Sequence, residues 1–226
     1  MSRAALDLSL YLVADRVLCG HRGVVSTVQA AVRGGATIVQ VREPLATTRE
    51  LCRLAEAVHL ALTGTGVPLL VNDRLDVALA VGAEGVHLGQ SDLPAAAARR
   101  VAGADFLIGL SVSDLRETAE ADALSAGTVD YLGVGPVFAT PTKPIAARPL
   151  GLHRTAVLRA ATRLPCVAIG GIDDNSAAQV LATGVNGIAV VSALCAAPDP
   201  EAAAATLRRT GPAAPVRGNE SGAGRA

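Results

Sequence analysis

Eight short apolar runs, each followed by an Ala-, Leu- and Arg-rich stretch, constrain the fold of this chain more than any other feature. Each run has the length of a strand, and most of the stretches between runs are long enough for a helix. Repeated strand–helix units with nearly continuous apolar strands predict an α/β protein, a closed (β/α)8 or TIM barrel. The predicted strands span residues 9–14, 37–41, 68–71, 85–88, 106–110, 131–134, 167–169 and 187–190.

The rival arrangement is a doubly wound open sheet. That fold would require a dinucleotide-type glycine fingerprint after the first strand, and the sequence there, Asp15-Arg16-Val17-Leu18, contains no glycine. We therefore expect one barrel domain over residues 1–210. Residues 211–226 are rich in Gly, Pro, Ala and Arg without periodicity, which predicts a disordered tail.

Composition agrees with a barrel and excludes some partners. Half of the residues are hydrophobic but only 2% are aromatic, so the core must be built from Ala, Val, Leu and Ile. The formal net charge is zero, which predicts neither nucleic acid nor an anionic membrane as a partner. No apolar run is long enough for a membrane span, and no signal peptide is evident, so we expect a cytoplasmic enzyme.

The unusual polar residues fall after the predicted strands. In a TIM barrel the catalytic groups lie at the C-terminal ends of the strands and in the loops that follow. This placement predicts that residues from separate strands share one rim, namely Gln40, Arg42, Asn72, Asp73, Asp92, Ser111, Thr140, Thr142, Lys143, Gly171, Val191 and Ser192.

Two anion sites are expected on that rim. Gly170-Gly171 and Val191-Ser192 follow strands 7 and 8, where barrels commonly bind a phosphate through backbone N–H groups. Asp73 and Asp92 offer two hard oxygen ligands, a number that suits Mg²⁺, which keeps waters and takes further ligands from substrate phosphates. The two sites together predict small phosphorylated substrates, one of them a diphosphate.

Lys143 is the only lysine among the 20 basic residues of the chain. It is the last residue of the loop sequence Thr140-Pro141-Thr142-Lys143. Two hydroxyl groups and an ammonium group in one short loop predict an anion-binding site. With Arg42, Lys143 is expected to clamp a polyphosphate.

Each of these features also has a structural interpretation. Asn72-Asp73 and Ser91-Asp92 have the composition of helix caps, and Gly170-Gly171 that of a turn. His87 alternates with apolar neighbours inside a predicted strand, which favours a structural or supporting role. The four cysteines have no metal-type spacing and read as buried small hydrophobic residues.

Taken in order, these motifs resemble the thiamine-phosphate synthase family over nearly the whole barrel. The matching segments are 40–43 (Gln-Val-Arg-Glu), 71–74 (Val-Asn-Asp-Arg), 85–92, 108–111, 130–138, 140–143 and 168–172. The resemblance implies a transferase that joins 4-amino-2-methyl-5-(diphosphooxymethyl)pyrimidine to thiazole phosphate. The products are thiamine phosphate and pyrophosphate, and Mg²⁺ is required.

The resemblance also implies roles for individual residues. Gln40, Arg42, Asn72, Ser111 and Lys143 would hold the pyrimidine diphosphate, and Asp73 and Asp92 would bind Mg²⁺. The thiazole phosphate would lie on Thr140, Thr142, Gly171, Val191 and Ser192.

Two positions depart from the family pattern. Pro44 stands where the family usually has lysine, two residues after the motif arginine, and Ser113 stands where many relatives have histidine. Pro44 keeps two alternatives open: a thiazole tautomerase on the same barrel, and a non-catalytic protein that binds thiazole phosphate or thiamine phosphate. Arg49 or Arg53 is a candidate substitute for the missing charge. The sequence allows a homo-oligomer without specifying one.

Overall fold

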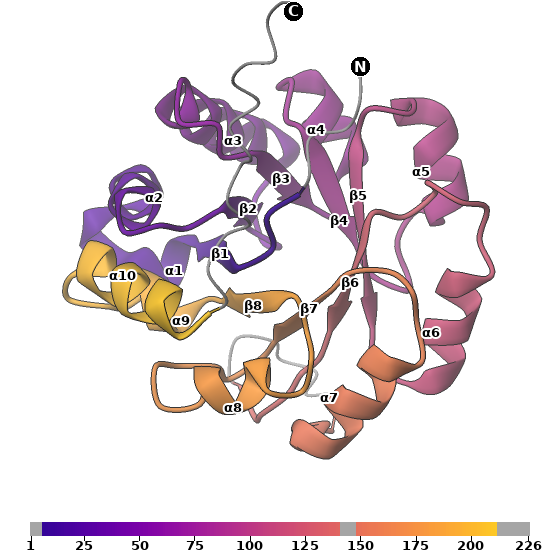
Figure 1. The fold of residues 1–226 in the computed structure, drawn as a ribbon. Helices are drawn as coiled ribbons and strands as arrows, with labels where there is room; N and C mark the ends of the chain where they lie inside the picture. Colours follow the sequence, from indigo (N-terminus) through magenta and orange to yellow (C-terminus); the bar gives the residue numbers. More distant parts are fainter. Residues whose placement is uncertain (1–5, 141–147, 212–226) are drawn as a thin grey trace, which may run out of the picture.

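The computed structural model describes residues 6–140 and 148–211 as eight parallel strands that close into a barrel, with helices around it (Figure 1). Each strand pairs with the next, and β8 pairs with β1. The predicted (β/α)8 fold is confirmed. The strands are β1 Leu10–Asp15, β2 Ile38–Arg42, β3 Leu69–Asn72, β4 Gly85–Leu88, β5 Leu107–Val112, β6 Tyr131–Val134, β7 Cys166–Ile169 and β8 Gly187–Val190.

Helices follow the strands in the expected alternation. They are α1 Arg16–Cys19, α2 Val24–Arg33, α3 Thr48–Leu62, α4 Leu75–Ala80, α5 Ala95–Ala102, α6 Leu115–Asp122, α7 Gly151–Ala160, α8 Ala177–Leu181, α9 Ser192–Cys195 and α10 Pro200–Thr210, with a short 3₁₀ helix at Gly20–Arg22. Residues 212–226, which hold most of the predicted tail, lie outside the described residues.

Local side-chain chemistry explains why helix α8 begins only at Ala177. The Asp173 carboxylate accepts hydrogen bonds from the Ser176 backbone N–H at 3.0 Å and from its hydroxyl at 2.7 Å. This turn occupies the positions that would otherwise form the first helical turn.

Two separate apolar clusters divide the core. The larger one lies between the outer faces of the strands and the helices. The smaller one fills the barrel and includes Tyr11, Ile38, Leu70, Tyr131 and Val167. Because the barrel interior is packed in this way, we expect a ligand to bind at an end of the barrel and not inside it.

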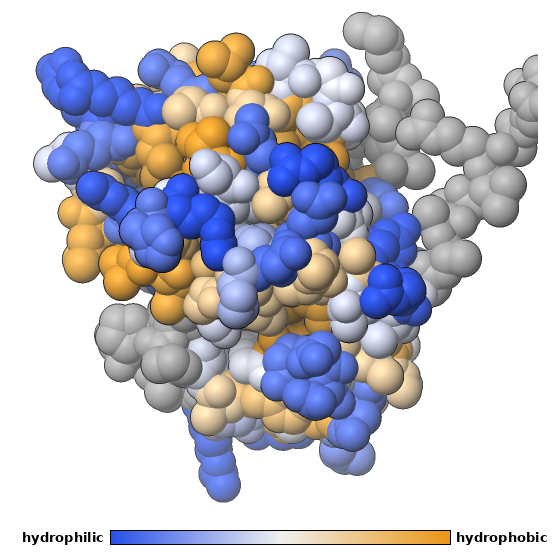
Figure 2. All heavy atoms as spheres, turned by 90° about the vertical axis from the view of Figure 1, so that its left-hand side faces the viewer, coloured by the Kyte–Doolittle hydropathy of each residue, from blue (hydrophilic) through white to orange (hydrophobic). Residues whose placement is uncertain are grey.

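One face of the outer surface shows how polar and apolar residues are distributed over the helices. On the face that carries α1, α2 and α10, hydrophilic and hydrophobic residues are interspersed (Figure 2). None of the described helices is both long and apolar enough to span a membrane.

Candidate functional site

A pocket of about 600 Å³ lies at the C-terminal ends of the strands. All of the predicted site residues within the described part of the chain line it: Gln40, Arg42, Asn72, Asp73, Asp92, Ser111, Thr140, Gly171, Val191 and Ser192. Thr142 and Lys143 lie outside the described residues. Residues that the sequence placed after the predicted strands therefore do lie in the wall of this pocket.

The backbone turns sharply after β3 at Asp73. This residue has φ of +61°, the only positive value among the described non-glycine residues. Its N–H donates to the carbonyl of His87 at 2.8 Å, which fixes the turn against β4. A residue other than glycine is uncommon in the left-handed region and stays there only when its surroundings hold it. The contacts around Asp73 therefore maintain this turn. It brings the Asp73 carboxyl group next to that of Asp92.

Asp73 and Asp92 form a carboxyl pair within hydrogen-bonding reach of each other. Burial, followed by the hydrogen bond and the charge of Asp92, raises the pKa of Asp73 to about 6, although the Arg42 guanidinium acts in the opposite direction. Two crowded carboxylates repel each other when both are ionised, and a divalent cation removes that repulsion. The donor set therefore fits Mg²⁺.

Neither aspartate is a helix cap. Helix α4 begins at Leu75 after Arg74, and α5 begins at Ala95 after Pro94. Asp92 instead accepts the backbone N–H of Gly89 at 2.7 Å, which holds its loop against the end of β4. The capping interpretation of these residues is wrong. Within the described residues no group of three or more His, Cys, Asp or Glu side chains is arranged for a metal, so other ligands of a cation at the Asp73–Asp92 pair would come from water or substrate.

On the opposite side of the pocket, the loop after β6 lies tightly against the end of β7. Val137 N–H donates to Ile169 O at 2.9 Å and Phe138 N–H to Gly170 O at 3.0 Å. Gly171 has φ of +64°, and a Cβ atom there would lie 2.7 Å from Ala139 O. Glycine is required at this contact, which brings Thr140 beside the β7 end.

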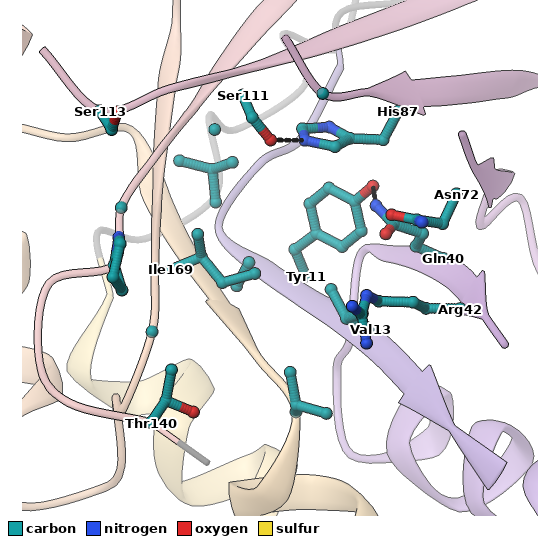
Figure 3. Close-up of a pocket in the computed structure, with 18 of the residues that line it drawn as sticks. Tyr11, Val13, Gln40, Arg42, Asn72, His87, Ser111, Ser113, Thr140 and Ile169 are labelled. Atoms are coloured by element: carbon teal, nitrogen blue, oxygen red, sulfur yellow. Dashed lines mark hydrogen bonds between the residues drawn. The ribbon is translucent and has the colours of Figure 1, made fainter. Parts of the chain in front are cut away.

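The β8 end completes this side. Val191 precedes the four-residue helix α9, and Ser192 is its first residue. Like Gly171 and Thr140, both residues line the pocket. Figure 3 shows Thr140 projecting from its loop. Backbone N–H groups and hydroxyl groups in this arrangement can bind a phosphate.

Hydrogen-bonded side chains form the floor of the pocket, and the sequence predicted only Gln40 and Ser111 among them as site residues. Gln40 Nε2 donates to Tyr11 Oη at 2.7 Å, and Tyr11 Oη lies 2.9 Å from Tyr131 Oη. The His87 ring joins Tyr131 Oη through Nδ1 at 2.9 Å. Through Nε2 it joins Ser111 Oγ, also at 2.9 Å (Figure 3). These five residues, which we name the floor network, connect β1, β2, β4, β5 and β6.

A sequence signal for the floor network existed. The chain has only two tyrosines, Tyr11 and Tyr131, and each lies within a predicted strand. A phenolic hydroxyl group buried in an aliphatic barrel requires a hydrogen-bond partner, so these tyrosines and His87 were candidates for one network.

The structure does not bring the candidate substitutes for the missing lysine to the pocket. Pro44 is exposed in the loop after β2, and neither Arg49 nor Arg53 lines the pocket. Arg42 is the only Lys or Arg in the pocket lining among the described residues. Ser113 bonds Glu117 through its hydroxyl at 2.9 Å and its N–H at 2.7 Å, so it serves the start of α6.

Comparison with known proteins identifies the family. The family model described as thiamine monophosphate synthase matches residues 10–194. Thiamine-phosphate synthases of Azorhizobium caulinodans and Albidiferax ferrireducens are 54% and 50% identical to the chain, covering 89% of it in each case and 94% and 91% of the relatives. The solved structure of thiamine phosphate pyrophosphorylase from Pyrococcus furiosus is 40% identical with a TM-score of 0.81, covering 91% of this chain and 96% of that one.

These relatives carry the name of the synthase over nearly their whole length, so they support the synthase over the tautomerase that the sequence left open. The order of the strand-end motifs and the pocket that they line agree with this result. The chain belongs to the thiamine monophosphate synthase family.

Proposed function

We propose that this chain is a cytoplasmic, Mg²⁺-dependent transferase that joins the pyrimidinylmethyl group of 4-amino-2-methyl-5-(diphosphooxymethyl)pyrimidine to thiazole phosphate, releasing pyrophosphate. The observation that carries the proposal is the composition of one pocket. It holds a carboxyl pair beside a guanidinium group on one side, and the Gly171 and Ser192 backbone on the other. One pocket thus offers sites for two different phosphate groups.

The diphosphate belongs on the side of β2 and β3. Arg42 presents a fork of N–H donors that suits a phosphate, and Lys143 would add a compact charge. Asp73 and Asp92 would hold Mg²⁺, which when bound would neutralise charge on the diphosphate. Gln40, Asn72 and Ser111 supply hydrogen-bonding groups for the rest of this substrate.

The thiazole phosphate belongs on the side of β7 and β8. Thr140, Gly171, Val191 and Ser192, with Thr142 of the same loop, would hold its phosphate group. This placement would fix the thiazole nitrogen toward the pyrimidine methylene carbon, so that binding energy is spent on orientation.

The reaction requires loss of diphosphate and attack by the thiazole nitrogen. In our proposal the C–O bond breaks first, and the aminopyrimidine stabilises the resulting methylene cation. Val13 and Ile169 also line the pocket and keep water from capturing that cation (Figure 3). The contribution of the protein is then mainly positioning and stabilisation of the leaving charge.

The direct test is to supply the purified chain with both substrates and Mg²⁺ and to measure pyrophosphate and thiamine phosphate together. We expect equal amounts of the two products, and none after addition of EDTA. Binding of thiazole phosphate without any product would contradict the synthase and favour the binding-only alternative that Pro44 suggests.

A further inference from the structure

Two glycines leave the space that the side chains of the floor network occupy. A Cβ atom at Gly109 would lie 2.5 Å from His87 Nδ1 and would also collide with the Tyr131 ring. A Cβ atom at Gly133 would lie 2.9 Å from His87 Cε1. Neither glycine has a positive φ, so it is space and not backbone conformation that requires glycine. His87 pairs in register with Gly109, and Gly109 pairs with Tyr131. The glycine between the two rings therefore leaves the space that both large side chains occupy.

The two tyrosine hydroxyl groups are buried in the barrel interior. Tyr11 is 1% and Tyr131 0% exposed, and their rings meet edge to face with centroids 5.9 Å apart. Burial raises the pKa of both phenols above the usual range, so each keeps its hydrogen. A buried hydroxyl hydrogen without an acceptor is costly, and each hydrogen must therefore be assigned to a partner.

The amide of Gln40 sets the direction of hydrogen bonding along the network. Because Gln40 Nε2 donates to Tyr11 Oη, the Tyr11 hydrogen must go to its other partner, Tyr131 Oη. The Tyr131 hydrogen then goes to His87 Nδ1. In the reverse direction the Tyr11 hydrogen would have no acceptor among the residues that the structure describes.

The assignment of hydrogens extends from His87 to Ser111. With Nδ1 accepting, the neutral His87 ring carries its hydrogen on Nε2 and donates it to Ser111 Oγ. Ser111 therefore keeps its own hydrogen for the pocket. At the other end, Gln40 uses Nε2 toward Tyr11 and presents its carbonyl oxygen as an acceptor.

We propose that Tyr11, Tyr131 and His87 are positioning residues that fix Ser111 as a hydrogen-bond donor and Gln40 as an acceptor toward the substrate. A donor and an acceptor set in advance match a heteroaromatic ring that pairs a ring nitrogen with an exocyclic amine. The substrate part of this proposal rests on the proposed function, under which that ring is the aminopyrimidine. The direction of the network does not depend on it.

The first test measures the His87 tautomer in the ligand-free chain. Nitrogen-15-labelled histidine at about pH 8, where an ordinary imidazole is neutral, shows which ring nitrogen carries the hydrogen. The His87 signal is assigned by its absence in His87→Gln, or by elimination with variants of His21, His59 and His153. We expect the hydrogen on Nε2, and a hydrogen on Nδ1 would overturn the proposal.

The second test separates positioning from general damage. Tyr131→Phe removes the donor to Nδ1, so the Ser111 hydroxyl can turn toward His87. We expect the KM for the pyrimidine diphosphate to rise about ten-fold or more, the scale of one lost hydrogen bond, and the KM for thiazole phosphate to stay within about two-fold. Tyr11→Phe should keep the Nε2 tautomer, because Tyr131 still donates to His87, and should give a smaller increase.

Thr155→Val is the matched control, because it removes a buried hydroxyl group that bonds Gly151 O at 2.9 Å in α7, outside the pocket lining. It should leave both KM values unchanged. Equal increases in both KM values in folded Tyr131→Phe, or no increase in either, would overturn the positioning role. If the chain makes no thiamine phosphate at all, the proposed function fails, while the tautomer measurement still decides the direction of the network.

Discussion

At the scale of single residues, we expect the carboxyl pair to decide how the site responds to pH and to a divalent cation. Asp73 and Asp92 come from neighbouring strand ends, and burial, followed by the proximity of Asp92, raises the pKa of Asp73 to about 6. In the absence of a cation, two ionised carboxyl groups this close together lower the stability of the fold at neutral pH. A bound cation would remove their repulsion and would itself be held by both groups.

Asp92→Asn should therefore act in opposite directions on stability and turnover. In EDTA at pH 7 we expect the variant to be more stable to urea than the unmodified chain by on the order of 1 kcal/mol, because the repulsion between two carboxylates is removed. With Mg²⁺ and substrates it should lose nearly all turnover. Normal Mg²⁺-dependent turnover in Asp92→Asn or Asp73→Asn would contradict the metal assignment.

The pH profile of the metal-free chain should show the same pair. A folded-state pKa raised from 3.8 to about 6 makes a contribution to stability that is fully present below about pH 4. That contribution is lost as the pH rises through about 6, since the folded chain binds the extra proton. Subtracting the urea-unfolding profile of Asp73→Asn should isolate this fall. A difference that stays flat or rises between pH 4 and 6 would mean that the pKa of Asp73 is not raised in the folded chain.

Pro44 is one of the two positions, with Ser113, at which this chain departs from the expected family pattern. If the diphosphate site is weakened by the missing charge, Pro44→Lys should raise kcat/KM for the pyrimidine diphosphate about ten- to hundred-fold, the scale of one charge-assisted hydrogen bond. Leu45→Lys, at a position 92% exposed next to it, controls for added charge alone. An unchanged rate in Pro44→Lys would show that other groups, Lys143 among them, already compensate.

At the scale of elements, the base of the barrel contains a largely buried ion pair that the family motif does not explain. Asp130 lies within the motif 130–138, yet its carboxylate accepts the Ile108 N–H at 2.8 Å and pairs with Arg99 at 2.8 Å. Arg99 also donates to the carbonyl oxygen of Phe106. These bonds tie α5 to the starts of β5 and β6, at the end of the barrel opposite the pocket.

Removing one partner of this pair should damage stability and spare chemistry. Arg99→Met leaves Asp130 buried without its cation, at a cost of about 3–5 kcal/mol in unfolding free energy. The exposed pair Arg116–Glu120 provides the control, since Arg116→Met should cost less than about 1 kcal/mol. Urea unfolding measures both, and KM values of folded Arg99→Met should match those of the unmodified chain. A changed KM would place Asp130 in the functional machinery.

At the scale of the whole molecule, the pocket lies where the ends of the strands meet. The rest of each strand is packed in the core. Its lining residues come from all eight strands or the loops that follow them. A ligand that binds there contacts separate βα units at once, so it stabilises the barrel as one body and not one loop of it.

Ligand binding should therefore be visible in cooperative unfolding. Mg²⁺ with pyrophosphate at about 100 times its Kd should add about 2.7 kcal/mol, which corresponds to roughly 5–10 °C in Tm for a domain of this size. Mg²⁺ with pyrophosphate should have no such effect on Asp73→Asn. A shift of equal size in that variant would place the metal elsewhere.

The sequence by itself determined the barrel, the strand positions within about two residues and the rim on which polar residues meet. Hydrophobic periodicity is a local property, and in a parallel barrel it fixes which end of every strand carries the loops of the site. Only the tertiary structure decided that the Asp73 and Asp92 carboxyl groups lie within hydrogen-bonding reach, that Asp130 pairs with Arg99 and that Tyr11, Tyr131, His87, Gln40 and Ser111 form one network. Those contacts depend on register between strands far apart in the sequence and on side-chain directions, which no local pattern records.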